Sequence, residues 1–151
     1  MKKLLLSTTL LSLLSGSVIA ASAFTEAEDA VSYRQHSFQL IRHNMADVKD
    51  MLTGAVPFEA SRLQKRADAL ATLTKLPWEA FTVPGADKAS KDAKAEIWQN
   101  LQDFQSRGEQ LAKDAKSLQS AAQTQDQAKV KAAFAAFAKN CKACHDKYKA
   151  D

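Results

Sequence analysis

The sequence predicts an all-α protein, an antiparallel up-down-up-down four-helix bundle, on two observations. Glycine and proline, which interrupt helices, are rare, with four and three copies in 151 residues, whereas alanine, lysine, glutamine, aspartate and leucine are abundant. In four separate segments the apolar residues recur every three or four positions, which places them on one face of a helix. The connections between these segments are short or moderate, and such connections favour antiparallel neighbours.

The first helix is expected to begin after Thr25, which offers an N-cap, and to stop near Gly54. Its apolar stripe consists of Val31, Phe38, Ile41, Met45, Val48 and Leu52. Pro57 is expected to open the second helix, because proline is favoured in a first turn, and Pro77 ends its pattern. The second stripe is narrower and consists of Leu63, Ala67, Leu70 and Leu73.

Residues 75–92 are expected to form the one long loop, since they contain Pro77, Pro84 and Gly85. The apolar side chains expected to anchor this loop are Trp78, Phe81 and Val83. The third helix has a stripe made of Ile97, Leu101, Phe104, Leu111 and Leu118. The fourth has a stripe made of Val130, Phe134, Phe137, Cys141, Cys144 and Tyr148.

The first 23 residues have the pattern of a cleaved signal peptide. Lys2 and Lys3 precede an apolar run that ends in the small-residue sequence ASA. Cleavage is expected after Ala23, with cleavage after Ala20 as the alternative. The run is too short and too rich in serine and threonine to span a membrane. Residues 24–151 are then expected to form one exported domain located in the periplasm.

The charge of the chain excludes two classes of partner. The whole chain carries a net charge of +4, and removal of Lys2 and Lys3 would leave +2. So small a charge does not predict binding to nucleic acid or to an anionic membrane surface. Removing residues 1–23 from the 151 leaves 128, which is enough for one domain with a real core.

A C-x-x-C-H sequence near the end of the chain carries the chemistry. Cys141, Cys144 and His145 have the spacing of c-type haem attachment, in which two thiols bind the porphyrin and the histidine binds iron. The alternatives are a redox dithiol, half of a zinc site and a short disulfide. No second cysteine pair or βαβ pattern supports the first two, and a disulfide across one helical turn has poor geometry. The three side chains leave one helix face, so we expect a single covalent haem c inside the bundle.

The other axial position of the iron depends on the first helix, which carries His36, His43, Met45 and Met51. At about 100° per residue, only Met45 points in nearly the same direction as Phe38. In an antiparallel bundle, however, the C-x-x-C-H sequence lies level with residues 30–38, about two turns from Met45. We therefore expect Met45 to be an ordinary core residue, Phe38 to face the iron and the iron to be five-coordinate.

Arg34 lies one turn before Phe38 on nearly the same face, with Gln35 beside it. A charged residue on an apolar stripe needs a partner. Haem propionates are the expected partner of Arg34, and the alternative is a side chain that extends to solvent at the end of the bundle.

Five stretches together resemble the cytochrome c′ family, within the class II c-type cytochromes. They are EDAVSYRQ, GAVPFEA, LPWEAF, AEIWQNLQDF and CKACHDKYK, in this order over nearly all of the expected mature chain. The resemblance implies a four-helix bundle with five-coordinate high-spin haem, usually a homodimer, that binds NO and CO and has proposed roles in electron transfer and NO tolerance. It also implies thioether bonds at Cys141 and Cys144, iron ligation by His145, and haem-edge positions at Arg34, Gln35 and Glu96.

Two positions depart from the family pattern. Lys149 stands where the family commonly has arginine, so a planar group with five donors is replaced by a point charge. Phe38 stands where many members have leucine and where low-spin relatives have a ligating methionine. An aromatic ring cannot ligate iron, and it fills more of the space opposite His145.

These observations leave two hypotheses of function. The first is a periplasmic haem protein that binds the diatomic gases NO or CO at an open iron position. The second is a low-spin, methionine-ligated electron carrier whose redox partner is an unknown protein. An enzyme is not expected, because no acid or base is predicted on the side of the haem opposite His145.

Overall fold

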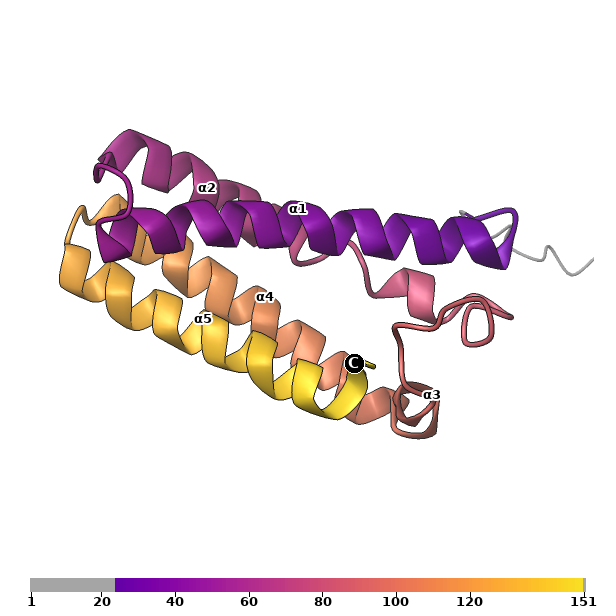
Figure 1. Ribbon diagram of the computed structural model, residues 1–151. Helices are drawn as coiled ribbons and strands as arrows, with labels where there is room; N and C mark the ends of the chain where they lie inside the picture. The colour runs from indigo at the N-terminus through magenta and orange to yellow at the C-terminus, as the bar shows by residue number, and fades with distance from the viewer. Residues whose placement is uncertain (1–23, 151) are drawn as a thin grey trace, which may run out of the picture.

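The computed structural model describes residues 24–150 and is helical. The predicted signal peptide, residues 1–23, lies outside the described residues. Its elements are α1 (Ala27–Thr53), α2 (Ala60–Leu73), the 3₁₀ helix η1 (Glu79–Phe81), α3 (Glu96–Gln99), α4 (Leu101–Gln123) and α5 (Gln127–Tyr148). The four long helices run alternately up and down (Figure 1). The predicted antiparallel four-helix bundle is confirmed.

The long helices begin and end where the local chemistry allows. Gly54 ends α1 as predicted, with a left-handed φ of 79° and its N–H bonded to the carbonyl of Asp50. The residue that precedes α1 is Glu26 rather than the predicted Thr25, and no side chain caps this end. At the start of α5 the Asp126 carboxylate accepts hydrogen bonds from two backbone N–H groups, which is a regular N-cap.

Two predicted helices differ from the structure. The second begins at Ala60 instead of Pro57, because the chain is still turning after α1: the N–H groups of Ala55 and Val56 both bond to the carbonyl of Asp50. The third is interrupted at Asn100, which has φ −132° and ψ 43° and separates α3 from α4. The Asn100 side chain donates to the carbonyl of Glu96 at 3.0 Å, so it competes with the helical backbone bonds.

The core contains two principal clusters that differ in chemistry. The aliphatic cluster joins the long helices and consists of Ile41, Val48, Met51, Leu63, Ala67, Leu70, Leu111, Ala115, Leu118, Ala122, Val130 and Phe137. The aromatic cluster consists of Phe81, Ile97, Phe104 and Tyr148, with Phe38, Trp78, Ala93, Trp98, Leu101 and Cys144 packed against it. Phe38 and Trp78 contact both clusters and lie at their boundary.

The buried face of α1 is centred on Arg34, Ile41 and Val48 rather than on Phe38. Met51 is therefore only 3% exposed and belongs to the aliphatic cluster, so the expectation that Met45 alone among the candidate ligands of the first helix points inward was wrong. The reason is that Phe38 lies at the edge of the buried face and is only half-buried.

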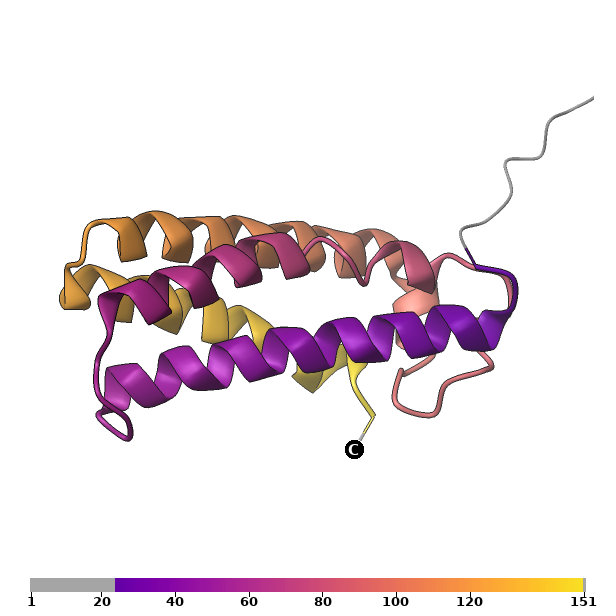
Figure 2. The same ribbon diagram turned by 90° about the horizontal axis from the view of Figure 1, so that it is seen from above.

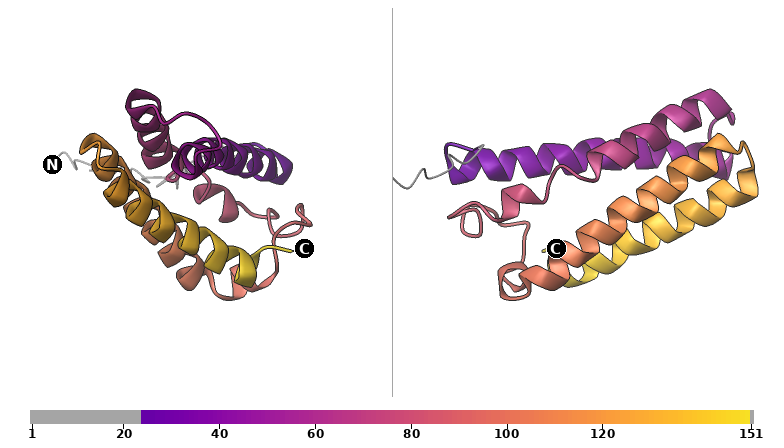
Figure 3. Two further views of the ribbon diagram at one scale, coloured as in Figure 1. Left: turned by 60° about the vertical axis from the view of Figure 1, so that its left-hand side comes forward. Right: turned by 180° about the vertical axis from the view of Figure 1, so that it is seen from behind.

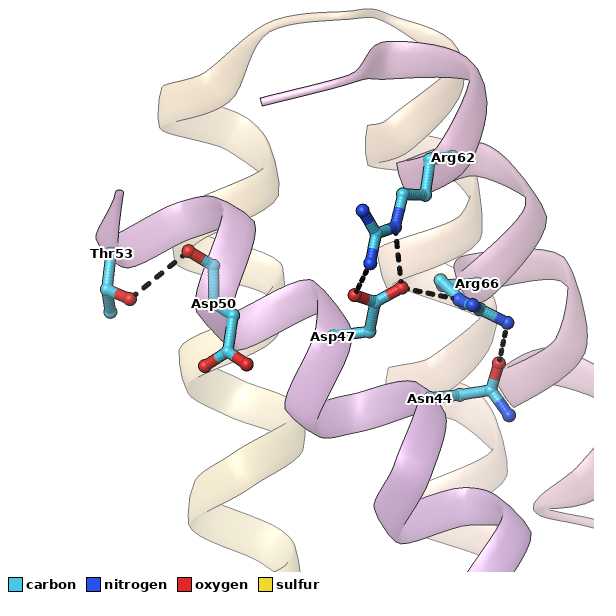
Figure 4. Close-up of polar contacts among 6 residues, drawn as sticks. All are labelled: Asn44, Asp47, Asp50, Thr53, Arg62 and Arg66. Atoms are coloured by element: carbon cyan, nitrogen blue, oxygen red, sulfur yellow. Dashed lines mark hydrogen bonds and ion pairs between the residues drawn. The ribbon is translucent and has the colours of Figure 1, made fainter. Parts of the chain in front are cut away.

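An ionic network fixes α1 against α2 within the bundle (Figure 4). Asp47, which is 9% exposed, accepts hydrogen bonds from the guanidinium groups of Arg62 and Arg66. Arg66 also donates to the Asn44 side chain at 3.4 Å. The two arginines hold the pKa of the Asp47 carboxyl below its usual range, and their hydrogen bonds are the largest cause.

The α1–α2 and α4–α5 pairs diverge toward the end of the bundle where α5 ends (Figures 1 and 3). The segment from the end of α2 to α4, with η1 and α3, lies at this end (Figure 2). There α1 packs on η1, and it packs only slightly on α5. Within residues 24–150, no helix combines the length and the apolar character needed to cross a membrane.

Candidate functional site

The two cysteines lie one helical turn apart near the end of α5, on the side that faces the core. Both are free and half-buried. Cys141 packs against the aliphatic cluster, and Cys144 packs against the aromatic cluster. His145, the next residue, is exposed. The thiols therefore lie at the boundary between the two clusters, the same boundary at which Phe38 lies.

Burial affects the protonation of the two thiols and of the histidine beside them. Burial raises the pKa of the Cys141 thiol to about 11, and burial also raises the pKa of Cys144. Both are protonated near neutral pH, whereas thiol exchange and zinc binding use thiolates. Although His145 is exposed overall, partial desolvation of its ring, and then the charge of Lys149, lowers its pKa and favours the neutral imidazole that can bind iron. Within the described part of the chain, no three His, Cys, Asp or Glu side chains converge as a metal site.

Aromatic rings form one side of the site. The ring centroids of Phe38 and Trp78 are 5.8 Å apart, those of Phe81 and Phe104 are 4.7 Å apart, and those of Phe104 and Tyr148 are 5.3 Å apart. These three contacts bring together α1, α4, α5 and the segment before α3 that contains η1. Apolar rings beside two protonated thiols fit a large planar apolar group such as a porphyrin.

Arg34 is 2% exposed and is held by the loop that crosses α1. It donates to the carbonyls of Ala80 at 3.4 Å and Ala86 at 3.0 Å, and its guanidinium lies 4.2 Å from the centroid of Phe81. The alternative in which Arg34 extends to solvent was wrong, because these carbonyls accept its N–H groups inside the protein. Desolvation lowers the pKa of Arg34, and the partners in the structure are carbonyls and a ring rather than a carboxylate.

Gln35, Glu96 and Lys149 lie at the surface of the same end of the bundle. Gln35 donates to the Asp92 carboxylate at 3.1 Å, and Glu96 is the first residue of α3. The backbone of Lys149 pairs with Ala93 in an isolated antiparallel bridge. This bridge brings the loop before α3, which Gln35 contacts through Asp92, beside the end of α5 that carries the cysteines.

A carboxylate that the sequence did not point to connects α4 to the end of α5. Asp103 accepts hydrogen bonds from Arg107 at 2.8 Å, from Lys147 at 3.0 Å and from the Tyr148 hydroxyl. These hydrogen bonds hold the pKa of Asp103 well below its usual range, and the bond from Arg107 has the largest effect. Asp103 and Arg107 are four residues apart on a predicted helix, and opposite charges at that spacing could have predicted their ion pair from the sequence.

Comparison with known proteins decides the family. The family model described as cytochrome c′ matches residues 29–149. The chain belongs to the cytochrome c′ family. It is 34% identical over 126 residues to cytochrome c′ of Alcaligenes xylosoxydans xylosoxydans, an alignment that covers 83% of this chain and 97% of the relative. The cytochrome c′ of Rubrivivax gelatinosus is 36% identical over 127 residues, with 83% of this chain and 98% of the relative covered.

Solved structures of cytochromes c′ have the same fold. The Shewanella frigidimarina protein is 44% identical and superposes with a TM-score of 0.81 over 85% of this chain and 99% of that chain. A nitric oxide complex of a variant of the Alcaligenes xylosoxidans protein superposes with a TM-score of 0.78 at 34% identity, over 85% of this chain and 99% of that chain. Cytochromes c′ carry one covalent haem c, so this chain is a haem-binding c-type cytochrome, and it has two cysteines.

Proposed function

We propose that this cytochrome c′ is exported to the periplasm and binds diatomic gases at a five-coordinate haem iron. Cys141 and Cys144 attach the haem through thioethers, and His145 is the axial ligand. The haem, when bound, supplies an iron that exchanges one electron and binds NO or CO. The half-buried thiols on one side of α5 and the lowered pKa of His145 support these roles. We propose no chemical reaction beyond binding and electron transfer.

The observation that carries the five-coordinate assignment is the position of Phe38. This side chain cannot ligate, and it packs at the boundary of the two clusters that hold Cys141 and Cys144. His36 and His43, by contrast, are exposed on the outer face of α1. Met45 packs against the aliphatic cluster alone, which supports the ordinary core role.

The polar residues proposed at the haem edge differ in how available their side chains are to bind a haem propionate. Gln35 and Glu96 are exposed, so no packing opposes an approach to a haem propionate. Arg34 is committed to two carbonyls, which use two of the five N–H donors of its guanidinium. We propose that Arg34 first holds the loop at residues 80–86 against α1 and that its remaining donors serve the propionate.

Spectroscopy of the purified holoprotein tests the proposal. Intact mass should exceed that of the cleaved polypeptide by one haem, and acid-acetone should not extract the pigment. Electron paramagnetic resonance of the ferric protein should show high-spin signals, and CO should change the absorption spectrum of the ferrous protein. A low-spin ferric spectrum that Met45→Ala converts to high-spin would replace the gas-binding function with that of a methionine-ligated electron carrier.

A further inference from the structure

The indole of Trp78 packs directly on the backbone of α4 at Gly108. A Cβ built on Gly108 would lie 2.7 Å from Cδ2 and 2.8 Å from Cε2 and Cε3 of Trp78, closer than real side-chain contacts. Gly108 is buried in the interior of a 23-residue helix, where glycine is less favourable than alanine. The close approach of the indole gives a physical reason for a glycine at this position.

Trp78 is fixed from two further directions. Its Nε1 donates to the carbonyl of Thr74 at 2.6 Å, and Thr74 is fully buried. The ring of Phe104 lies 5.5 Å away at an interplanar angle of 66°. The indole therefore cannot retreat toward α4, where the backbone of Gly108 lies, and it cannot rotate without losing its hydrogen bond.

The edge-on neighbour of this fixed indole is Phe38. The two ring centroids are 5.8 Å apart at 84°, and the other ring beside Phe38 is that of Phe81, at 6.4 Å. Aromatic rings in a packed core move only into space that their neighbours leave. The position of Trp78 thus limits how far the Phe38 ring can move.

We propose that Gly108 and Trp78 together set the rate at which a diatomic ligand reaches the iron, because they fix the space into which the Phe38 ring is displaced. This inference rests on the proposed function: where Phe38 lies on the side of the iron opposite His145, a ligand that binds the open position has to pass its ring. Neither residue needs to touch the ligand: Trp78 is a positioning residue, and Gly108 determines how deeply its indole lies.

The test is stopped-flow CO association with the ferrous holoprotein. Gly108→Ala and Trp78→Leu are each made in the wild-type and in the Phe38→Ala background. Gly108→Ala pushes the indole toward Phe38 and should slow association by about threefold or more, whereas Trp78→Leu should speed it by about the same factor. In the Phe38→Ala background both effects should fall below about twofold, because the ring that transmits them is absent.

Two further measurements separate this role from a merely structural one. Phe58→Leu removes a partly buried ring that packs against the aliphatic cluster at the opposite end of the bundle, and it should leave the association rate unchanged. Thermal unfolding reports the steric contact without any ligand. Gly108→Ala should lower the unfolding midpoint when Trp78 is present and lower it less in the Trp78→Leu background.

The outcomes distinguish the two proposals. If the ferrous protein binds no CO, the proposed function fails and this inference fails with it. If the ferrous protein binds CO but Phe38→Ala binds it at the wild-type rate, only this inference is overturned. If Phe38→Ala is faster but Gly108→Ala and Trp78→Leu change the rate equally in both backgrounds, or not at all, only this inference is overturned. Should Gly108→Ala fail to fold, Trp78→Leu decides the question by the same comparison.

Discussion

The two ends of the bundle are built differently. At the end where α1 meets α2, the long helices pack directly on one another through aliphatic side chains, and small residues such as Ala67 and Ala115 are fully buried between them. At the other end the helix pairs diverge, and aromatic rings and the loop between α2 and α4 fill the space (Figure 1). At the first end the side chains of the long helices meet directly, whereas the second end is filled by rings and a loop and carries the two thiols.

The ionic networks differ in the same way. Asp47 is nearly buried between two arginines on one neighbouring helix, and it joins α1 to α2. The side chain of Asp103 is 44% exposed, and it joins α4 to the residues that follow His145. Removal of one partner costs more folding free energy in a buried ion pair than in an exposed one, because it leaves an uncompensated buried charge. We therefore expect substitutions at the aliphatic end to change stability and those at the aromatic end to change the haem.

The largest effect is expected from the cysteines. The double substitution Cys141→Ser and Cys144→Ser removes both thiols and should abolish covalent haem attachment. Intact mass spectrometry would then give the mass of the polypeptide alone. The matched control is Leu118→Ala at the aliphatic end, which should keep the added mass of one haem. Covalent haem in the double variant would contradict the assignment of the attachment site.

Leu118→Ala itself should have the next largest effect, on stability. The side chain of Leu118 is fully buried in the aliphatic cluster, and its truncation should lower the free energy of unfolding by about 3 kcal/mol through lost burial and a cavity. Urea unfolding of the holoprotein measures this loss. The absorption spectrum of the folded variant should match the wild type, and a shifted haem spectrum would show that the two ends are coupled.

Asp47→Asn should have a smaller effect at the same end. The amide cannot accept the charged hydrogen bonds of Arg62 and Arg66 equally well, so the free energy of unfolding should fall by about 2 kcal/mol. Asp50→Asn is the matched control, because Asp50 lies on the same helix and its carboxylate makes no drawn contact with either arginine (Figure 4). Equal losses for the two variants would mean that the Asp47 network adds nothing specific.

Much of this contrast could be predicted from the sequence, because it depends on local patterns. The apolar stripes of α1 and α5 follow the helical period, Gly54 marks a helix end, and the spacing of the C-x-x-C-H sequence predicts the attachment residues. The break at Asn100 was missed, because the apolar period continues across it and an asparagine inside a helical pattern is tolerated.

The partners of Arg34 and Gly108 could not be predicted, because they come from a loop. The sequence indicates that Arg34 needs a partner, but backbone carbonyls such as that of Ala86 leave no signature in the amino-acid order. Gly108 likewise reads as a weak point in a helix until Trp78, thirty residues earlier, is known to lie on it. Both contacts depend on the path of residues 74–95, which follows no period.

The smallest expected effect is the pH dependence contributed by Asp103. Its pKa is lowered in the folded protein by hydrogen bonds from Arg107, then from Tyr148 and Lys147. A carboxyl with a depressed folded pKa adds stability above its unfolded pKa of about 3.9, and this contribution is lost as the pH falls below that value toward the folded pKa. Because the group is half-exposed, added salt should weaken the effect.

Asp103→Asn should therefore unfold at a lower temperature than the wild type at pH 7, and the gap between the two should narrow as the pH falls from about 4.5 to about 2.5. The comparison of the two proteins at each pH cancels the titration of every other group, including His145. Asp50→Asn serves again as the control, because the one contact drawn to Asp50 in Figure 4 is made by its backbone carbonyl and not by its carboxylate. If the difference in unfolding temperature stays constant through this acid range, the charge of Asp103 contributes nothing to stability at the end of the bundle that carries the cysteines. Asp103 would then stabilise α5 only through packing and uncharged hydrogen bonds.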